Sequence, residues 1–250
     1  MTRFFHWFSL LAAPFLHSNT EKKMSISPGG LFGFYNLGVA AYIKDHYNLS
    51  DYRFSGTSAG SWVALFLTAK TNTTEMTENL LRNVNERRPK SVYQVEMILK
   101  DVLLTQYQTA DFDLDRLSIS MTTFNPLISK TVYSQFGSLE DAVNASIASS
   151  HIPYITGGLC TQYRDVYSLD GVFSGDTGIH FAAADEHPSL FSISPFMWKN
   201  STSWCSSWMK FTHLFSLKKI NISQLFYEGY ADTMRNDPQL QKTFSPLFPQ

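Results

Sequence analysis

From residue 24 onward, short apolar or β-branched runs alternate with longer stretches in which apolar residues recur every three or four positions. The short runs predict strands, and the longer periodic stretches predict helices. We predict strands over 24–27, 52–55, 117–124, 130–136 and 191–196, and a short strand from 166 that ends in Asp170-Gly171. We predict helices over 34–46, 59–67, 75–85, 91–104, 139–149 and 220–234. Such an alternation is typical of the α/β class.

The chain of 250 residues is long enough to bury one large core, and we assign residues 24–250 to a single domain. Residues 1–23 form an apolar N-terminal extension, in which Arg3 precedes an apolar stretch over 4–16. That stretch is too short to span a bilayer as a helix. A signal peptide, an interfacial membrane anchor and a plain extension of the domain are all open interpretations.

Composition narrows the classes of function. The chain has 20 Phe, 12 Tyr and 5 Trp, which indicates either large buried aromatics or an apolar surface that faces lipid. A net charge of −1 gives no reason to expect nucleic-acid binding. Cys160 and Cys205 exclude a disulfide framework and a four-cysteine zinc site but allow one disulfide. Several N-x-S/T sequons leave secretion open.

The strongest motif is G-x-S-x-G, in which Ser58 lies between Gly56 and Gly60. A strand precedes the serine and a helix follows it, which is the setting of a nucleophile elbow. The two glycines allow the neighbouring backbone to approach closely in a strained turn. In the alternative interpretation, Ser58 only caps the following helix. The strand, turn and helix context favours a catalytic serine.

A second motif is the glycine-rich turn from Gly29 to Gly33, which feeds the helix over 34–46. Backbone N–H groups in such a turn bind either a phosphate or an oxyanion. The turn has no Walker lysine and no clean G-x-G-x-x-G pattern, and an elbow serine follows it. An oxyanion hole is therefore the better interpretation.

The stretch GGLFGFYNLGVAAYI, followed by FSGTSAGS, resembles the start of patatin-like phospholipase domains, most closely the branch of adipose triglyceride lipase and adiponutrin. The resemblance implies a patatin-like three-layer α/β/α sandwich with a mostly parallel central sheet, so that 24–250 would be one hydrolase domain. The family's loop reads S-G-x-G-x-x-G, and here Pro28 replaces its first glycine. Because proline has no N–H, the implied oxyanion donors are Gly29, Gly30 and Leu31, together with Ala59.

The segment SSHIPYITG resembles the family's stretch before its second catalytic motif, and Asp170-Gly171 occupies the place of that motif. The resemblance implies that Asp170 is the catalytic base for Ser58, although Val172 replaces the usual third small residue. Asp165 and Asp176 are the alternative carboxylates. Because the family works without a histidine base, we interpret His151 as a packed or surface residue.

The implied function is a lipid acyl hydrolase that cleaves fatty-acyl esters of phospholipids or glycerides through an acyl-serine, without a metal or cofactor. The implied partner is lipid at a membrane or lipid-droplet surface, on the cytoplasmic side, and no nucleic acid. One alternative is a catalytically weak or inactive lipid-binding protein, which Pro28 and Val172 motivate. Another is an α/β-hydrolase with a Ser-Asp-His triad, for which the histidines in suitable chain order are His180, His187 and His213.

Overall fold

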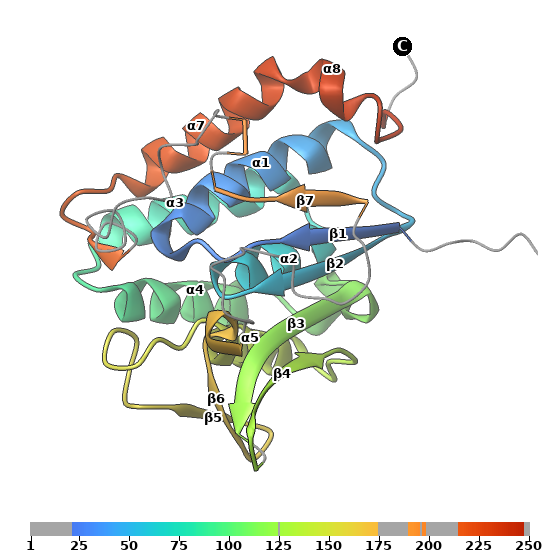
Figure 1. Ribbon diagram of the computed structural model, residues 1–250. Helices are drawn as coiled ribbons and strands as arrows, with labels where there is room; N and C mark the ends of the chain where they lie inside the picture. The colour runs from blue at the N-terminus through green and yellow to red at the C-terminus, as the bar shows by residue number, and fades with distance from the viewer. Residues whose placement is uncertain (1–21, 125, 175–189, 196, 199–214, 248–250) are drawn as a thin grey trace, which may run out of the picture.

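The computed structural model describes residues 22–124, 126–174, 190–195, 197–198 and 215–247 (Figure 1). Its strands are β1 (Lys22–Ile26), β2 (Tyr52–Thr57), β3 (Leu117–Phe124), β4 (Ile128–Tyr133), β5 (Thr161–Tyr163), β6 (Val166–Leu169) and β7 (Phe191–Ile193). Its helices are α1 (Gly33–His46), α2 (Ala59–Thr68), α3 (Thr73–Arg87), α4 (Val92–Gln106), α5 (Leu139–Ser149), α7 (Ile222–Arg235) and α8 (Asp237–Leu240).

The strands form one seven-stranded sheet in the order β5-β6-β3-β2-β1-β7, with β4 also paired to β3. The neighbours β7, β1, β2 and β3 are parallel, whereas β4 and β6 run antiparallel to β3, and β5 antiparallel to β6. Five of these strands, β1, β2, β3, β5 and β7, therefore point in one direction. Helices surround the sheet (Figure 1). The prediction of an α/β fold with a mostly parallel sheet is confirmed, and the arrangement is consistent with a three-layer α/β/α sandwich.

Strands β2 and β6 pair with different parts of β3, and this arrangement brings Ser58 and Asp170 together. Its first half pairs with β2, up to Thr57 opposite Ser120, and its last residues pair with β6, from Leu169 opposite Thr122. Strand β4 pairs along 119–124 and so occupies the other edge of β3. The C-terminal ends of β2 and β6 therefore meet on the same edge of β3, opposite residues 120 and 122. Ser58 follows β2 and Asp170 follows β6, so both residues lie beside Met121 of β3.

Helix α1 is buried from Gly33 to Ile43, and not only on the predicted apolar side, whereas its last residues, 44–46, are partly or fully exposed. Helix α7 packs against the other side of α1, the side that contains Tyr35 and Gly38. A Cβ atom on Gly38 would lie 2.0 Å from the carbonyl oxygen of Phe226, and one on Gly229 would lie 2.1 Å from that of Tyr35. The two glycines therefore permit an approach between α1 and α7 that any larger residue would block.

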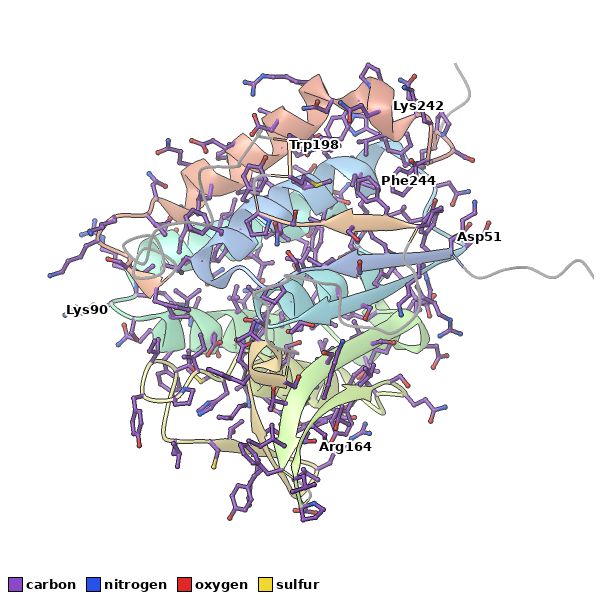
Figure 2. All side chains as sticks on the ribbon, viewed as in Figure 1. Asp51, Lys90, Arg164, Trp198, Lys242 and Phe244 are labelled. Carbon is purple, nitrogen blue, oxygen red and sulfur yellow. The ribbon has the colours of Figure 1, made fainter. Side chains whose placement is uncertain are left out.

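Aromatic side chains tie the end of the chain to the sheet. Phe244 packs against the rings of Tyr47, Tyr52 and Phe191, at centroid distances of 4.9 to 5.5 Å (Figure 2). Trp198, which lies near α7, donates its ring N–H to Thr233 at 3.0 Å (Figure 2). Some of the many aromatic residues therefore pack inside the protein.

Several predictions on the ends of elements need correction. Strand β4 begins at Ile128 and ends at Tyr133, and not at 130 and 136. Strand β5 was not predicted, and β1 begins at Lys22, two residues inside the segment that we assigned to the N-terminal extension. Within the described ranges, no helix is both long enough and apolar enough to cross a membrane. Residues 1–21, Asp176, His180, His187, Cys205 and His213 lie outside the described residues.

Candidate active site

Ser58 stands at the turn between β2 and α2, with φ of 55° and ψ of −131°. Positive φ is costly for a residue with a side chain, so the surrounding structure must hold it there. The glycines on both sides allow the tight turn. A Cβ atom on Gly56 would lie 2.3 Å from the carbonyl oxygen of Gly60, and one on Gly60 would lie 2.4 Å from that of Ile26. The strand, strained turn and helix predicted for a nucleophile elbow are therefore present.

Ser58 and Asp170 are in direct contact. The Ser58 hydroxyl donates a hydrogen bond to Asp170 Oδ2 at 2.5 Å, and the backbone N–H of Val172 donates to Asp170 Oδ1 at 3.0 Å. Both side chains are buried, with 4% of Ser58 and 1% of Asp170 exposed. Each carboxylate oxygen thus has one donor, and the serine proton points at the carboxylate.

The backbone around Asp170 is fixed on several sides. Its N–H donates to the carbonyl of His151 at 2.7 Å, and its carbonyl accepts the Thr122 hydroxyl at 2.8 Å. A Cβ atom on Gly171 would lie 2.4 Å from the Thr57 side chain, so glycine is required there. Val172 contributes its backbone N–H while nearly half of the residue is exposed. Valine at this position is therefore compatible with the contact.

The environment of Asp170 suits a base that works near neutral pH. Burial raises its pKa to about 7, while the hydrogen bonds from Ser58 and from the Val172 N–H oppose the rise. An ordinary aspartate, with a pKa near 3.9, is a weak base by comparison. A carboxylate whose pKa lies near the working pH can accept the serine proton and return it later in the reaction.

The glycine loop forms a short 3-10 turn, η1 (Gly30–Phe32), which leads directly into α1. Gly30 has a φ of 51°, which favours glycine. The N–H groups of Gly30 and Leu31 begin the turn, where no carbonyl of the turn itself can accept them. The Ala59 N–H stands in the same situation at the start of α2. These three residues and Ser58 line one cavity.

Gly29 is the exception among the predicted donors. It is absent from the residues that line the cavity, and a Cβ atom on it would lie 2.9 Å from the Pro195 ring. Its glycine is explained by this contact. Gly30, Leu31 and Ala59 therefore line the same cavity as Ser58, whereas Gly29 does not.

Ser149 is a residue of the site that the sequence did not reveal. Its hydroxyl accepts the backbone N–H of Ser58 at 2.8 Å and donates to the carbonyl of Ser120 at 2.7 Å. This bridge holds the elbow at its positive φ against β3. Because the Ser58 N–H is occupied, it is not available to an oxyanion, unlike that of Ala59. The only sequence signal was the Ser-Ser pair that opens SSHIPYITG.

His151 is packed, which is the first of the two positions, packed or surface, that we allowed for it. It is 4% exposed, and its Nε2 lies 3.1 Å from the carbonyl oxygen of Gly158. Burial lowers the pKa of His151. Asp165, one of the alternative carboxylates, lies in the turn between β5 and β6 with a φ of 62°. Neither the His151 ring nor the Asp165 carboxylate takes part in the hydrogen bond between Ser58 and Asp170, although the His151 backbone carbonyl accepts the Asp170 N–H.

A cavity of about 830 Å³, including its open mouth, lies beside Ser58. Its walls come from α1, α2, α3 and α4 and are mostly apolar. The apolar lining includes Leu37, Val63, Phe66, Leu80, Leu99 and Leu103. The apolar character of this lining suits an acyl chain.

Polar groups interrupt this lining at Ser58, Glu96, Ser150 and Thr156. Glu96 was missed, because it lies within a stretch of α4 that its apolar spacing marked as a core face. In the part of the chain that the structure describes, no three His, Cys, Asp or Glu side chains gather as a metal site.

The chain matches no protein-family model and no curated protein.

Proposed function

We propose that this protein is a patatin-like lipid acyl hydrolase, which cleaves fatty-acyl esters of phospholipids or glycerides with a Ser58-Asp170 dyad. The observation that carries the proposal is the 2.5 Å hydrogen bond from the Ser58 hydroxyl to the buried Asp170 carboxylate, made at a strained elbow. The neighbouring apolar cavity supports an acyl chain as the substrate's principal feature.

In the proposed reaction, Asp170 accepts the Ser58 proton as Oγ attacks the ester carbonyl carbon. The N–H groups of Gly30, Leu31 and Ala59 stabilise the negative oxygen of the tetrahedral intermediate. The intermediate collapses by breaking the bond to the alcohol oxygen, which takes the proton from Asp170 and leaves. Asp170 then removes a proton from water, which attacks the acyl-serine, and the fatty acid departs as Oγ regains its proton.

The alternatives are less well supported. A Ser-Asp-His triad needs an imidazole between the serine and the carboxylate, and the 2.5 Å contact leaves no room for one. A non-catalytic lipid-binding protein was motivated by Pro28 and Val172. Yet Val172 donates to Asp170 through its backbone, and Pro28 precedes the turn whose residues Gly30 and Leu31 line the cavity. Neither residue stands in the way of the proposed chemistry.

The substrate is proposed to lie at a membrane or lipid-droplet surface, on the cytoplasmic side. Large apolar side chains are exposed near the site, including Tyr154 and Leu159 in the loop after α5 and Phe173 just beyond Asp170. Exposed apolar groups close to a lipid-hydrolysing site favour contact with an interface.

The test is the release of fatty acid from micellar glyceride and phospholipid esters. Ser58→Ala and Asp170→Asn are expected to lower kcat by at least about 100-fold, because each removes a partner of the proton transfer. Asp165→Asn is the matched control, since it removes a carboxylate from a turn outside the site. Equal activity of the unmodified chain and Ser58→Ala would overturn the proposal.

A further inference from the structure

The mechanism does not use Glu96, a carboxyl group in α4 that lines the cavity. The residue is 4% exposed. Its Oε1 accepts the Ser150 hydroxyl at 2.6 Å, whereas its Oε2 is buried and has no hydrogen-bond partner among the described residues. A buried polar atom without a partner is costly and calls for an explanation. Because Glu96 lines the cavity, one explanation is that a ligand in the cavity supplies the missing hydrogen bond.

Glu96 lies close to the reaction centre. Ser149 binds the backbone N–H of Ser58, and the next residue, Ser150, binds Glu96. Ser150 also accepts the ring N–H of Trp62, which lies one turn after Ser58 in α2 and lines the same cavity. Ser58 and Glu96 line the same cavity, and the charge of Asp170 acts on the Glu96 carboxyl. A ligand in this cavity can therefore meet both the nucleophile and the Glu96 carboxyl.

The Glu96 carboxyl holds its proton more tightly than an exposed glutamate does. Burial raises its pKa to about 8, the charge of Asp170 acts in the same direction, and the hydrogen bond from Ser150 opposes them. A protonated carboxyl group can both donate and accept a hydrogen bond. A hydroxyl group has the same two capacities, so the two groups are complementary without any buried charge.

We propose that Glu96 binds a free hydroxyl group of the substrate's alcohol, so that the preferred esters are partial glycerides and not fully acylated or simple alkyl esters. This inference rests on the proposed function. In a partial glyceride the free hydroxyl lies one or two carbons from the esterified oxygen, so it is a polar group close to the bond that Ser58 would attack. The carboxyl oxygen that is unpartnered in the described structure gains its hydrogen bond when the substrate binds.

The test uses ligands that cannot be hydrolysed. We compare 1-O-octylglycerol with its dimethyl ether, in which both hydroxyls are methylated, below micelle-forming concentrations and by titration calorimetry. The unmodified chain is expected to bind the free glycerol ether about 5- to 100-fold more tightly, because the methylated ligand can accept but not donate and so leaves one of the carboxyl's two hydrogen bonds unmade. Glu96→Gln, which still donates and accepts, should keep most of this preference. Glu96→Leu should lose it.

Three outcomes would overturn the inference: equal affinity for the two ethers, binding of neither, or a preference that survives in Glu96→Leu. The Glu96→Gln variant provides a second test in case Glu96→Leu does not fold. If a folded Glu96→Gln chain loses the preference for the free glycerol ether, hydrogen bonding between residue 96 and a ligand hydroxyl is contradicted. The ligands carry no ester, so the readout is independent of catalysis. A chain that shows the Glu96-dependent preference but hydrolyses no ester would refute the proposed function alone.

Discussion

The replacement Asp170→Asn is expected to stabilise the fold at alkaline pH while it removes the proposed base. Asp170 is buried, and its pKa rises from the ordinary 3.8 to about 7. Between these two pH values the folded chain keeps a proton that the unfolded chain has already released. The stability that this proton contributes is fully present below about pH 4 and is lost as pH rises through about 7.

The magnitude follows from the pKa change. Each tenfold change in proton affinity is worth about 1.4 kcal/mol, so the ionised Asp170 costs the fold about 4 kcal/mol at pH 8. Asparagine carries no charge, and its carbonyl can still accept the Val172 N–H while its amide donates to the Ser58 hydroxyl. We therefore expect Asp170→Asn to be about 2 to 4 kcal/mol more stable than the unmodified chain at pH 8, and only about 1 kcal/mol more stable at pH 4.5, where an unfolded aspartate with a pKa of 3.8 is already mostly ionised.

The assay is urea unfolding at pH 4.5, 6, 7 and 8, followed by tryptophan fluorescence. Glu96 titrates with the same sign, since its pKa is also raised, so the slope of the unmodified chain contains both groups. The difference between that chain and Asp170→Asn reports Asp170 together with its effect on Glu96, whose pKa the Asp170 charge raises. Asp165→Asn serves as the control and should show no such pH-dependent gain. A difference that does not change with pH, or that makes Asp170→Asn less stable at pH 8, would refute the reasoning.

Three further predictions concern the elbow and its base. In Gly60→Ala the new Cβ would lie 2.4 Å from the Ile26 carbonyl oxygen, so urea unfolding should show a loss of about 1 to 3 kcal/mol; an unchanged midpoint would contradict the close approach. Ser149→Ala leaves the buried Ser58 N–H unpaired and should cost about 1 to 3 kcal/mol with a lower kcat, which a fully stable, fully active variant would disprove. The kcat/KM for ester hydrolysis should rise with pH through about 7, because Asp170 must be ionised to accept a proton; a rate already at its plateau at pH 5 would argue against this base.

The elbow was predictable because local chemistry determines it. A strand, two glycines and an apolar helix within one short stretch specify the turn at Ser58, and the structure has that turn. Asp170 was found through the resemblance and not through geometry, since an Asp-Gly pair alone predicts only a turn. Its place beside Ser58 depends on how β2 and β6 share β3, which no local pattern encodes.

The missed features depend on contacts between distant parts of the chain. Ser149 reaches a backbone N–H 91 positions away, and Ser150 meets Glu96 across 54 positions. The burial of both faces of α1 requires α7, which lies nearly two hundred residues later in the chain. Strand β5 has three residues, too few to show an alternating pattern. Each of these features depends on tertiary packing, which a local sequence pattern does not contain.

The most direct test of the dyad is labelling with a fluorophosphonate, read as intact mass. The reagent adds to a serine oxygen only where that serine is activated. We predict one adduct on the unmodified chain, none on Ser58→Ala and a sharply slower reaction with Asp170→Asn, while Asp165→Asn labels at the normal rate. If the folded chain stays unlabelled, both in detergent and on lipid vesicles, or if Ser58→Ala is labelled equally, Ser58 is not an activated nucleophile and the proposed hydrolase is contradicted.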